Sequence, residues 1–138
     1  MLRYNYLRLF FIIIFFFSIS YILLTSCQKQ ELKKKYEGTY YFTTINYYWT
    51  ITTTICDTIQ YLGNIRAESK TTLEIQYAPG FPSLYPAVDK EGVLSYDSYV
   101  NQNNYFSGSF TEDGNINFII GHSNKGGGTC RYVSGIKQ

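Results

Sequence analysis

Residues 105–120 read YFSGSFTEDGNINFII, and this stretch decides the fold class. Apolar and polar side chains alternate on both sides of the pair Asp113-Gly114, with Phe106 and Phe110 on the first flank. Alternation with a period of two is typical of half-buried strands. An Asp-Gly pair between two such runs predicts a hairpin closed by a type I′ turn, whose two central residues have positive φ.

The composition of residues 36–138 is that of a β protein. Tyr, Thr, Ile and Phe dominate this part of the chain, and these residue types suit a pleated, half-buried surface. Beside the hairpin strands we expect strands near residues 38–45, 58–67, 72–77, 93–96 and 129–136. One turn must lie between the first two strands, either near Asn46 or within residues 52–54.

Two stretches are expected to be loops. Residues 78–92 hold all three prolines, which do not fit inside a sheet, and residues 121–128 are rich in glycine. The resulting fold class is all-β, an antiparallel meander of seven or eight strands. A small barrel is preferred because closure removes exposed strand edges, and a sandwich is the alternative.

The N-terminus predicts export. Residues 1–8 carry Arg3 and Arg8 without an acid, residues 9–24 are largely apolar, and small or polar residues follow. This order is typical of a signal peptide, with an uncleaved N-terminal anchor as the alternative. We therefore divide the chain into a signal segment (residues 1–26), a tether (residues 27–35) and a single β domain (residues 36–138).

The residues Leu24-Thr25-Ser26-Cys27 resemble the lipobox of bacterial lipoproteins. This resemblance implies cleavage before Cys27, attachment of diacylglycerol to its thiol, and anchoring in the outer membrane, on the periplasmic face or at the cell surface. Residues 28–31, QKQE, are similar to the signal that exports some Bacteroidetes lipoproteins to the surface. Two or three acyl chains anchor a protein firmly in a bilayer.

A second resemblance concerns the β domain. Residues 36–40, YEGTY, together with Arg131 near the C-terminus, resemble the lipocalin-like proteins. That resemblance implies a late Arg lying over an early aromatic ring, here Tyr40. The chain from residue 36 to Gly135-Ile136-Lys137 is also similar to small Bacteroidetes lipoproteins of unassigned function. Neither resemblance supplies a ligand.

Charge and cysteine content limit the function classes. Residues 36–138 carry six basic and nine acidic side chains, which gives no electrostatic footprint for nucleic acid. With Cys27 lipidated, Cys56 and Cys130 remain. They are the candidate disulfide of an exported domain, and two buried free thiols are the alternative.

No constellation for catalysis is found. His122 is the one histidine, lies in a stretch expected to be a solvated loop, and has no nucleophile motif to serve. One His and two distant Cys do not make a metal site. Residues 121–129 lack the lysine and the helix of a phosphate-binding loop, and Glu112-Asp113 belongs to a turn. We therefore expect no enzyme activity, no cofactor and no metal.

Aromatic residues are the unusual feature, because residues 36–138 contain twelve Tyr, five Phe and one Trp. We take Tyr48, Trp49, Phe81 and Tyr85 as candidate contact residues for a protein or glycan partner, since exposed Tyr and Trp recur in binding surfaces. A structural role at the open end of the barrel is the alternative. The leading hypothesis is a membrane-anchored, non-catalytic binding domain.

Two other functions compete with it. One is a lipocalin-like carrier of a small apolar ligand. The other is an inhibitor of an enzyme such as lysozyme, suggested by Ser107-Gly108-Ser109, which resembles part of the signature of lysozyme inhibitors.

Overall fold

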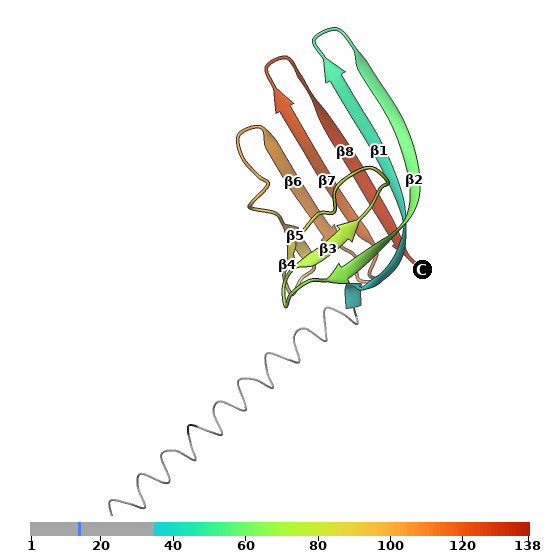
Figure 1. Ribbon diagram of the computed structural model, residues 1–138, viewed down its shortest axis with the longest axis vertical. Coiled ribbons are helices and arrows are strands. Elements are labelled where there is room, and N and C mark those ends of the chain that lie inside the picture. Colours follow the sequence, from blue (N-terminus) through green and yellow to red (C-terminus); the bar gives the residue numbers. More distant parts are fainter. Residues whose placement is uncertain (1–13, 15–34) are drawn as a thin grey trace, which may run out of the picture.

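The computed structural model describes residue 14 and residues 35–138 (Figure 1). The predicted signal segment and Cys27 with the tether up to residue 34 lie outside the described residues, apart from Ile14. In the part of the chain that is described, no helix combines the length and the apolarity needed to cross a membrane.

Residues 38–137 form one antiparallel sheet of eight strands, so the predicted all-β meander is confirmed. The strand order is β3-β2-β1-β8-β7-β6-β5-β4, and pairing of the last strand with the first converts the meander into a barrel-shaped sheet. The strands are β1 (Gly38–Thr50), β2 (Thr54–Ala67), β3 (Leu73–Gln76), β4 (Ala87–Val88), β5 (Val93–Ser95), β6 (Asn104–Phe110), β7 (Ile116–Asn124) and β8 (Gly127–Lys137).

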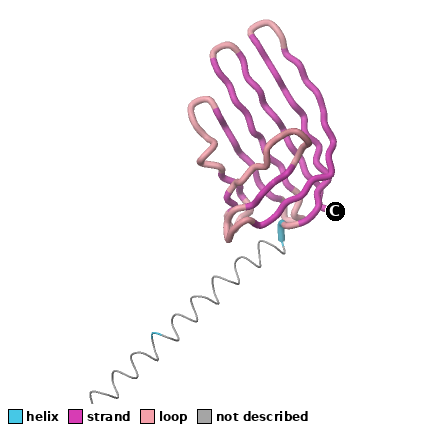
Figure 2. The backbone as a smooth tube through the Cα atoms, viewed as in Figure 1, coloured by secondary structure: helices cyan, strands magenta, loops and turns pink. Residues whose placement is uncertain are grey.

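The barrel closes at one end only. There, the segment that follows β3 turns back along it, and Ile75 and Leu84 exchange two backbone hydrogen bonds of 2.9 and 3.0 Å. Beyond this closed end, the hairpins β1–β2 and β7–β8 project past the short strands (Figures 1 and 2). We call the projecting parts of these two hairpins the fingers. The preferred barrel is therefore confirmed as a nearly closed one, with a packed end and an open end.

The core fills the packed end. Side chains from all eight strands and from the segment after β3 point inward, and Tyr77 meets Phe118 edge-on with ring centroids 5.3 Å apart. Each buried aliphatic or aromatic side chain stabilises the fold by roughly 1.5–3 kcal/mol relative to exposure. The core residues are Tyr36, Tyr40, Phe42, Ile65, Leu73, Ile75, Tyr77, Ala78, Leu84, Val88, Leu94, Phe110, Ile116, Phe118, Ile120 and Val133.

Tyr40 ties the start of the domain to a distant turn. Its buried hydroxyl lies 2.8 Å from the carbonyl oxygen of Tyr36 and 3.0 Å from that of Gly114, and it donates to this pair of acceptors. Burial raises the pKa of Tyr40, because the charged phenolate is penalised away from water. Tyr40 thus supplies a buried polar contact between β1 and the β6–β7 turn.

The turn predicted between the first two strands lies at the second of its two expected places. β1 runs on to Thr50, whose hydroxyl oxygen accepts a hydrogen bond of 3.1 Å from the amide of Thr53. The strands expected at residues 38–45 and 58–67 are accordingly longer. Residues 54–58 showed no readable alternation because all five are exposed.

The structure corrects two turn predictions. The β6–β7 hairpin exists, but Gly114, with φ of 79°, is its one residue with positive φ, so the turn is not type I′. Thr111 and Asn115 close a three-residue loop instead. Residues 121–128 are also not a loop, because β7 reaches Asn124 and β8 begins at Gly127.

Substitution of Tyr40 tests the buried contact. Tyr40→Phe should lower the free energy of unfolding by about 1–3 kcal/mol, because two buried carbonyl oxygens lose their donor. Tyr41→Phe is the matched control, since its hydroxyl bonds to Gln60 at the surface and its loss should cost under about 0.5 kcal/mol. Urea unfolding followed by Trp49 fluorescence measures both. Equal losses in the two variants would contradict the assigned role.

Candidate functional site

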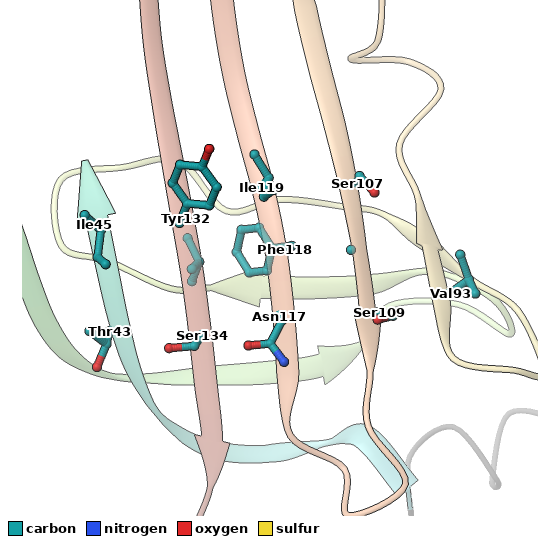
Figure 3. A pocket seen from close by; sticks show the side chains of 12 residues that line it. Thr43, Ile45, Val93, Ser107, Ser109, Asn117, Phe118, Ile119, Tyr132 and Ser134 are labelled. Carbon is teal, nitrogen blue, oxygen red and sulfur yellow. The ribbon is translucent and has the colours of Figure 1, made fainter. Parts of the chain in front are cut away.

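The outer face of the sheet carries a groove across β1, β8, β7, β6 and β5. The inward residues of these strands are core, so the intervening side chains point outward. Figure 3 shows the residues that line the groove, among them Phe118 of the core. The groove has a volume of about 580 Å³. We call it the outer groove, and it is lined by Thr43, Ile45, Val93, Ser107, Gly108, Ser109, Asn117, Phe118, Ile119, Tyr132, Val133 and Ser134.

The pairing register sorts the lining into rows that cross the strands. One row consists of hydroxyl and amide side chains, Thr43, Ser134, Asn117 and Ser109. The next row toward the open end is mainly apolar, Ile45, Tyr132, Ile119 and Ser107. The groove therefore places hydrogen-bonding groups beside apolar contact area.

An aromatic hollow adjoins the groove toward the open end. It has a volume of about 330 Å³ and shares Tyr132 with the groove, so the two form one continuous surface. Tyr132 and Tyr47 meet edge-on with ring centroids 5.6 Å apart. We call this hollow the aromatic cup, and it is lined by Tyr47, Trp49, Tyr105, Cys130 and Tyr132.

Two glycines make room for the rings of the cup. Gly121 pairs with Tyr105, and Gly128 pairs with Trp49. A Cβ atom added at either glycine would overlap the aromatic ring of its partner. Each ring thus covers bare backbone on the neighbouring strand, which compensates for the low strand preference of glycine. This pairing was missed from the sequence, because it is visible only once the register is known.

No residue that lines the outer groove or the aromatic cup carries a formal charge. Burial, followed by a hydrogen bond with the Cys130 thiol, raises the pKa of Tyr105 to about 12. The pKa values of Tyr47 and Tyr132 are also raised, mainly by the Cys56 and Cys130 thiols respectively. These phenols therefore stay neutral at physiological pH.

The four contact residues expected from the sequence do not share one surface. Trp49 lines the aromatic cup, whereas Tyr48, being adjacent in the strand, points to the opposite face. Phe81 is partly buried and stacks on Tyr77 at 6.0 Å. Tyr85 is exposed on the segment after β3, where its hydroxyl lies 3.4 Å from the Glu74 carboxylate. The expected set therefore contributes Trp49 alone to the cup.

The expected disulfide is not formed. Cys56 is an exposed free thiol and Cys130 a buried one. Tyr47 on β1 pairs with Cys56 on one side and with Cys130 on the other, so a whole strand lies between them. Two inter-strand spacings amount to about 10 Å, beyond the roughly 7 Å between Cα atoms that a disulfide spans.

His122 and Arg131 lie on the inner face at the open end. His122 is half-buried in β7, not in a solvated loop, and its Nδ1 lies 2.7 Å from Oδ1 of Asn104. The guanidinium of Arg131 lies over Phe81, 4.1 Å from the ring centroid, whereas the resemblance to lipocalin-like proteins implied a stack on Tyr40. Within residues 35–138, no three His, Cys, Asp or Glu side chains gather as metal ligands.

Comparison with known proteins finds no relative: no family model, no curated protein and no solved structure matches the chain.

Alkylation tests the state of the two thiols. Iodoacetamide added to the native full chain without reductant should modify the exposed Cys56, and should reach the buried Cys130 only after unfolding. Peptide mass spectrometry locates the adducts, and Cys56→Ser should remove the fast one. If both thiols resisted alkylation even after unfolding, and reacted only once reductant was added, Cys56 and Cys130 would be joined in a disulfide, which would contradict the two free thiols.

Proposed function

We propose that this chain is a lipid-anchored binding protein, not an enzyme, and that it holds a neutral glycan against the outer groove and the aromatic cup. The observation that carries the proposal is an uncharged surface in which aromatic rings border a row of hydroxyl and amide groups. A sugar ring has C–H faces that pack on aromatic rings and a rim of hydroxyl groups that need hydrogen-bond partners.

The dimensions of the surface support an oligosaccharide rather than a single sugar. Tyr47 on β1 and Tyr105 on β6 occupy the same transverse row and are separated by β8 and β7. Three inter-strand spacings place these backbones about 14 Å apart. A chain of about three sugar rings would cover this width. Tyr132 and the row of hydroxyl and amide groups lie next to this line of contacts, on its side toward the packed end.

The lack of charge favours a neutral ligand. An acidic sugar, a phosphate or a nucleic acid would lose its hydration on this face without gaining a cationic partner. Glycoside hydrolysis usually requires two carboxyl groups beside the scissile bond, and none lines the groove or the cup. Both points support capture of a neutral glycan without cleavage.

A surface site is favoured over an interior one. The packed end of the barrel is filled by side chains such as Phe42, Ile75 and Phe118, each at most 2% exposed. A carrier of an apolar ligand would need this volume for its cargo. The filled interior therefore supports the outer face as the place of binding.

Glycan binding is tested with Tyr132 and a matched control. Trisaccharides to hexasaccharides, neutral and acidic, are titrated into the full chain by isothermal calorimetry. At least one neutral oligosaccharide should bind, and Tyr132→Ala should weaken it at least tenfold by removing the ring shared by groove and cup. Tyr85→Ala is the control, because Tyr85 is similarly exposed, 45% against 48%, but lies away from the outer groove.

Two results would contradict this proposal. One is preference for acidic over neutral oligosaccharides. The other is equal loss of binding in Tyr85→Ala and Tyr132→Ala.

Lipid anchoring is tested at Cys27. The wild-type chain should incorporate labelled palmitate and sediment with membranes, because several acyl chains hold a protein firmly. Cys27→Ser should lose the label, retain its signal segment and run at a higher mass. A wild-type chain that takes up no palmitate would contradict the anchor, and it would leave the glycan proposal standing.

A further inference from the structure

The part of β2 nearest the β1–β2 turn, Thr54–Gly63, pairs with another strand on one side only. β1 pairs with β2 from Thr54 to Ile65, whereas β3 pairs only with Asn64–Ala67. Along Thr54–Gly63, backbone hydrogen bonding within the described residues is therefore limited to the β1 side. Figure 1 shows this length of β2 at the free margin of the β1–β2 finger.

The register identifies the backbone groups that face outward. Ile75 exchanges both of its hydrogen bonds with Leu84, so its neighbours Glu74 and Gln76 face β2 and pair with Arg66 and Asn64. Even-numbered residues of β2 therefore direct their N–H and C=O groups away from β1. Along the unpaired length these residues are Thr54, Cys56, Thr58, Gln60 and Leu62.

This edge lacks most of the protection that natural edge strands carry. An exposed edge is usually shortened, bulged, or blocked by proline or charged side chains. Residues 54–63 contain no proline and no lysine, and their pairing with β1 is continuous, without a bulge. Their single charge is the side-chain carboxylate of Asp57, which has no ion-pair or hydrogen-bond partner within residues 35–138. By comparison, the free length of β6 covers only Asn104–Ser107.

We infer that this edge binds an extended peptide segment of a partner protein by β-strand addition, with a basic side chain of the partner facing Asp57. In this mode, main-chain hydrogen bonds supply affinity and alternate side chains supply specificity. The five outward-facing residues match the alternate bonding of a partner strand of about nine residues. Asp57 lies near the middle of that length and is the group that selects charge.

A second copy of the chain fits this edge less well. Two β2 edges paired about their centres would bring two Asp57 carboxylates together on one face, and like charges across a strand pair are destabilising. No basic side chain within residues 54–63 is available to offset them. A heterologous strand with Lys or Arg avoids this conflict. The inference concerns the edge of the sheet and does not depend on glycan binding at the outer face.

The experiment uses designed peptide probes and the full chain in detergent. The first probe is an acetylated nonapeptide of alternating Thr and Val with Lys at position 5, which lies opposite Asp57 in an antiparallel pair. The second has Glu at position 5. The third is the Lys probe with N-methyl groups at positions 2, 4, 6 and 8, the four amides that face β2 in this register. The Lys probe should slow amide hydrogen exchange at Cys56, Thr58 and Gln60 at least tenfold in NMR spectra. It should bind at least tenfold tighter than the Glu probe at low salt, and the N-methylated probe should not bind.

Thr58 offers a matched pair of variants. Thr58→Pro removes one outward N–H and leaves the ladder to β1 intact, because Thr58 does not bond to β1, so probe binding should be lost. Thr58→Ala keeps that N–H and should bind as wild type. Asp57→Asn should bring the Lys and Glu probes to equal affinity.

Three results would overturn the inference. The first is unchanged binding by Thr58→Pro. The second is protection of residues 104–107 instead of the β2 amides. The third is a dimer in the absence of probe that Thr58→Pro dissociates, which would assign the edge to a second copy. The N-methylated probe tests the inference on the wild-type chain, so the test stands even if Thr58→Pro does not fold. Binding of that probe as tight as that of the Lys probe would also overturn the inference.

Discussion

β1 is paired along nearly its whole length with β2 on one side and with β8 on the other, and this double pairing is the constraint on which the fold depends. The register runs from Gly38 to Trp49 against β2 and from Tyr40 to Thr50 against β8. Because β8 is the last strand, its pairing with β1 joins the two ends of the domain. All inward-facing residues then point to one interior, where Tyr40 and Phe42 of β1 are fully buried.

Strand length determines where this interior is closed. β1, β2, β7 and β8 are long, whereas β3, β4 and β5 have at most four residues. The short strands complete the barrel only around the packed end. Beyond that end the long strands continue, and no strand within residues 35–138 lies opposite them across the interior. The aromatic cup and the unpaired β2 edge both lie on these continuations, which makes them consequences of one mismatch in strand length. The outer groove, lined partly by Val93 of β5, begins where the barrel is still complete.

The sequence predicted the elements whose two faces differ in environment. β6 and β7 alternate clearly because one face is core, and Ile116, Phe118 and Ile120 identify that face. Prediction failed at residues 54–58, because both faces of that length are exposed and no alternation is required. It also failed at residues 121–128, where the glycines suggested a loop. Gly121 and Gly128 lie in strands because the rings of Tyr105 and Trp49, on neighbouring strands, cover them.

The candidate site was predicted only in part for the same reason. Trp49 was among the four aromatic residues taken from the sequence as contact residues, and it lines the aromatic cup. Tyr105 and Tyr132 were not, because their outward direction depends on the register of β6 and β8 with their neighbours. Tyr48 and Trp49 were both taken as contact residues of one surface, although adjacent residues of a strand point to opposite faces. Long-range pairing, which local patterns do not encode, accounts for these errors.

The two ends of the domain are not equivalent, because the chain enters it at the packed end. Tyr36 stacks on Phe110 with ring centroids 4.0 Å apart, and Nζ of Lys137 donates a 2.8 Å hydrogen bond to the carbonyl of Lys35. The finger tips lie at the opposite pole of the molecule (Figure 2). If the chain is anchored to a membrane upstream of Lys35, as proposed, the packed end would stand nearest the bilayer and the fingers would project into the surrounding medium. A large polymer or a neighbouring protein could then reach the fingers without approaching the lipid headgroups.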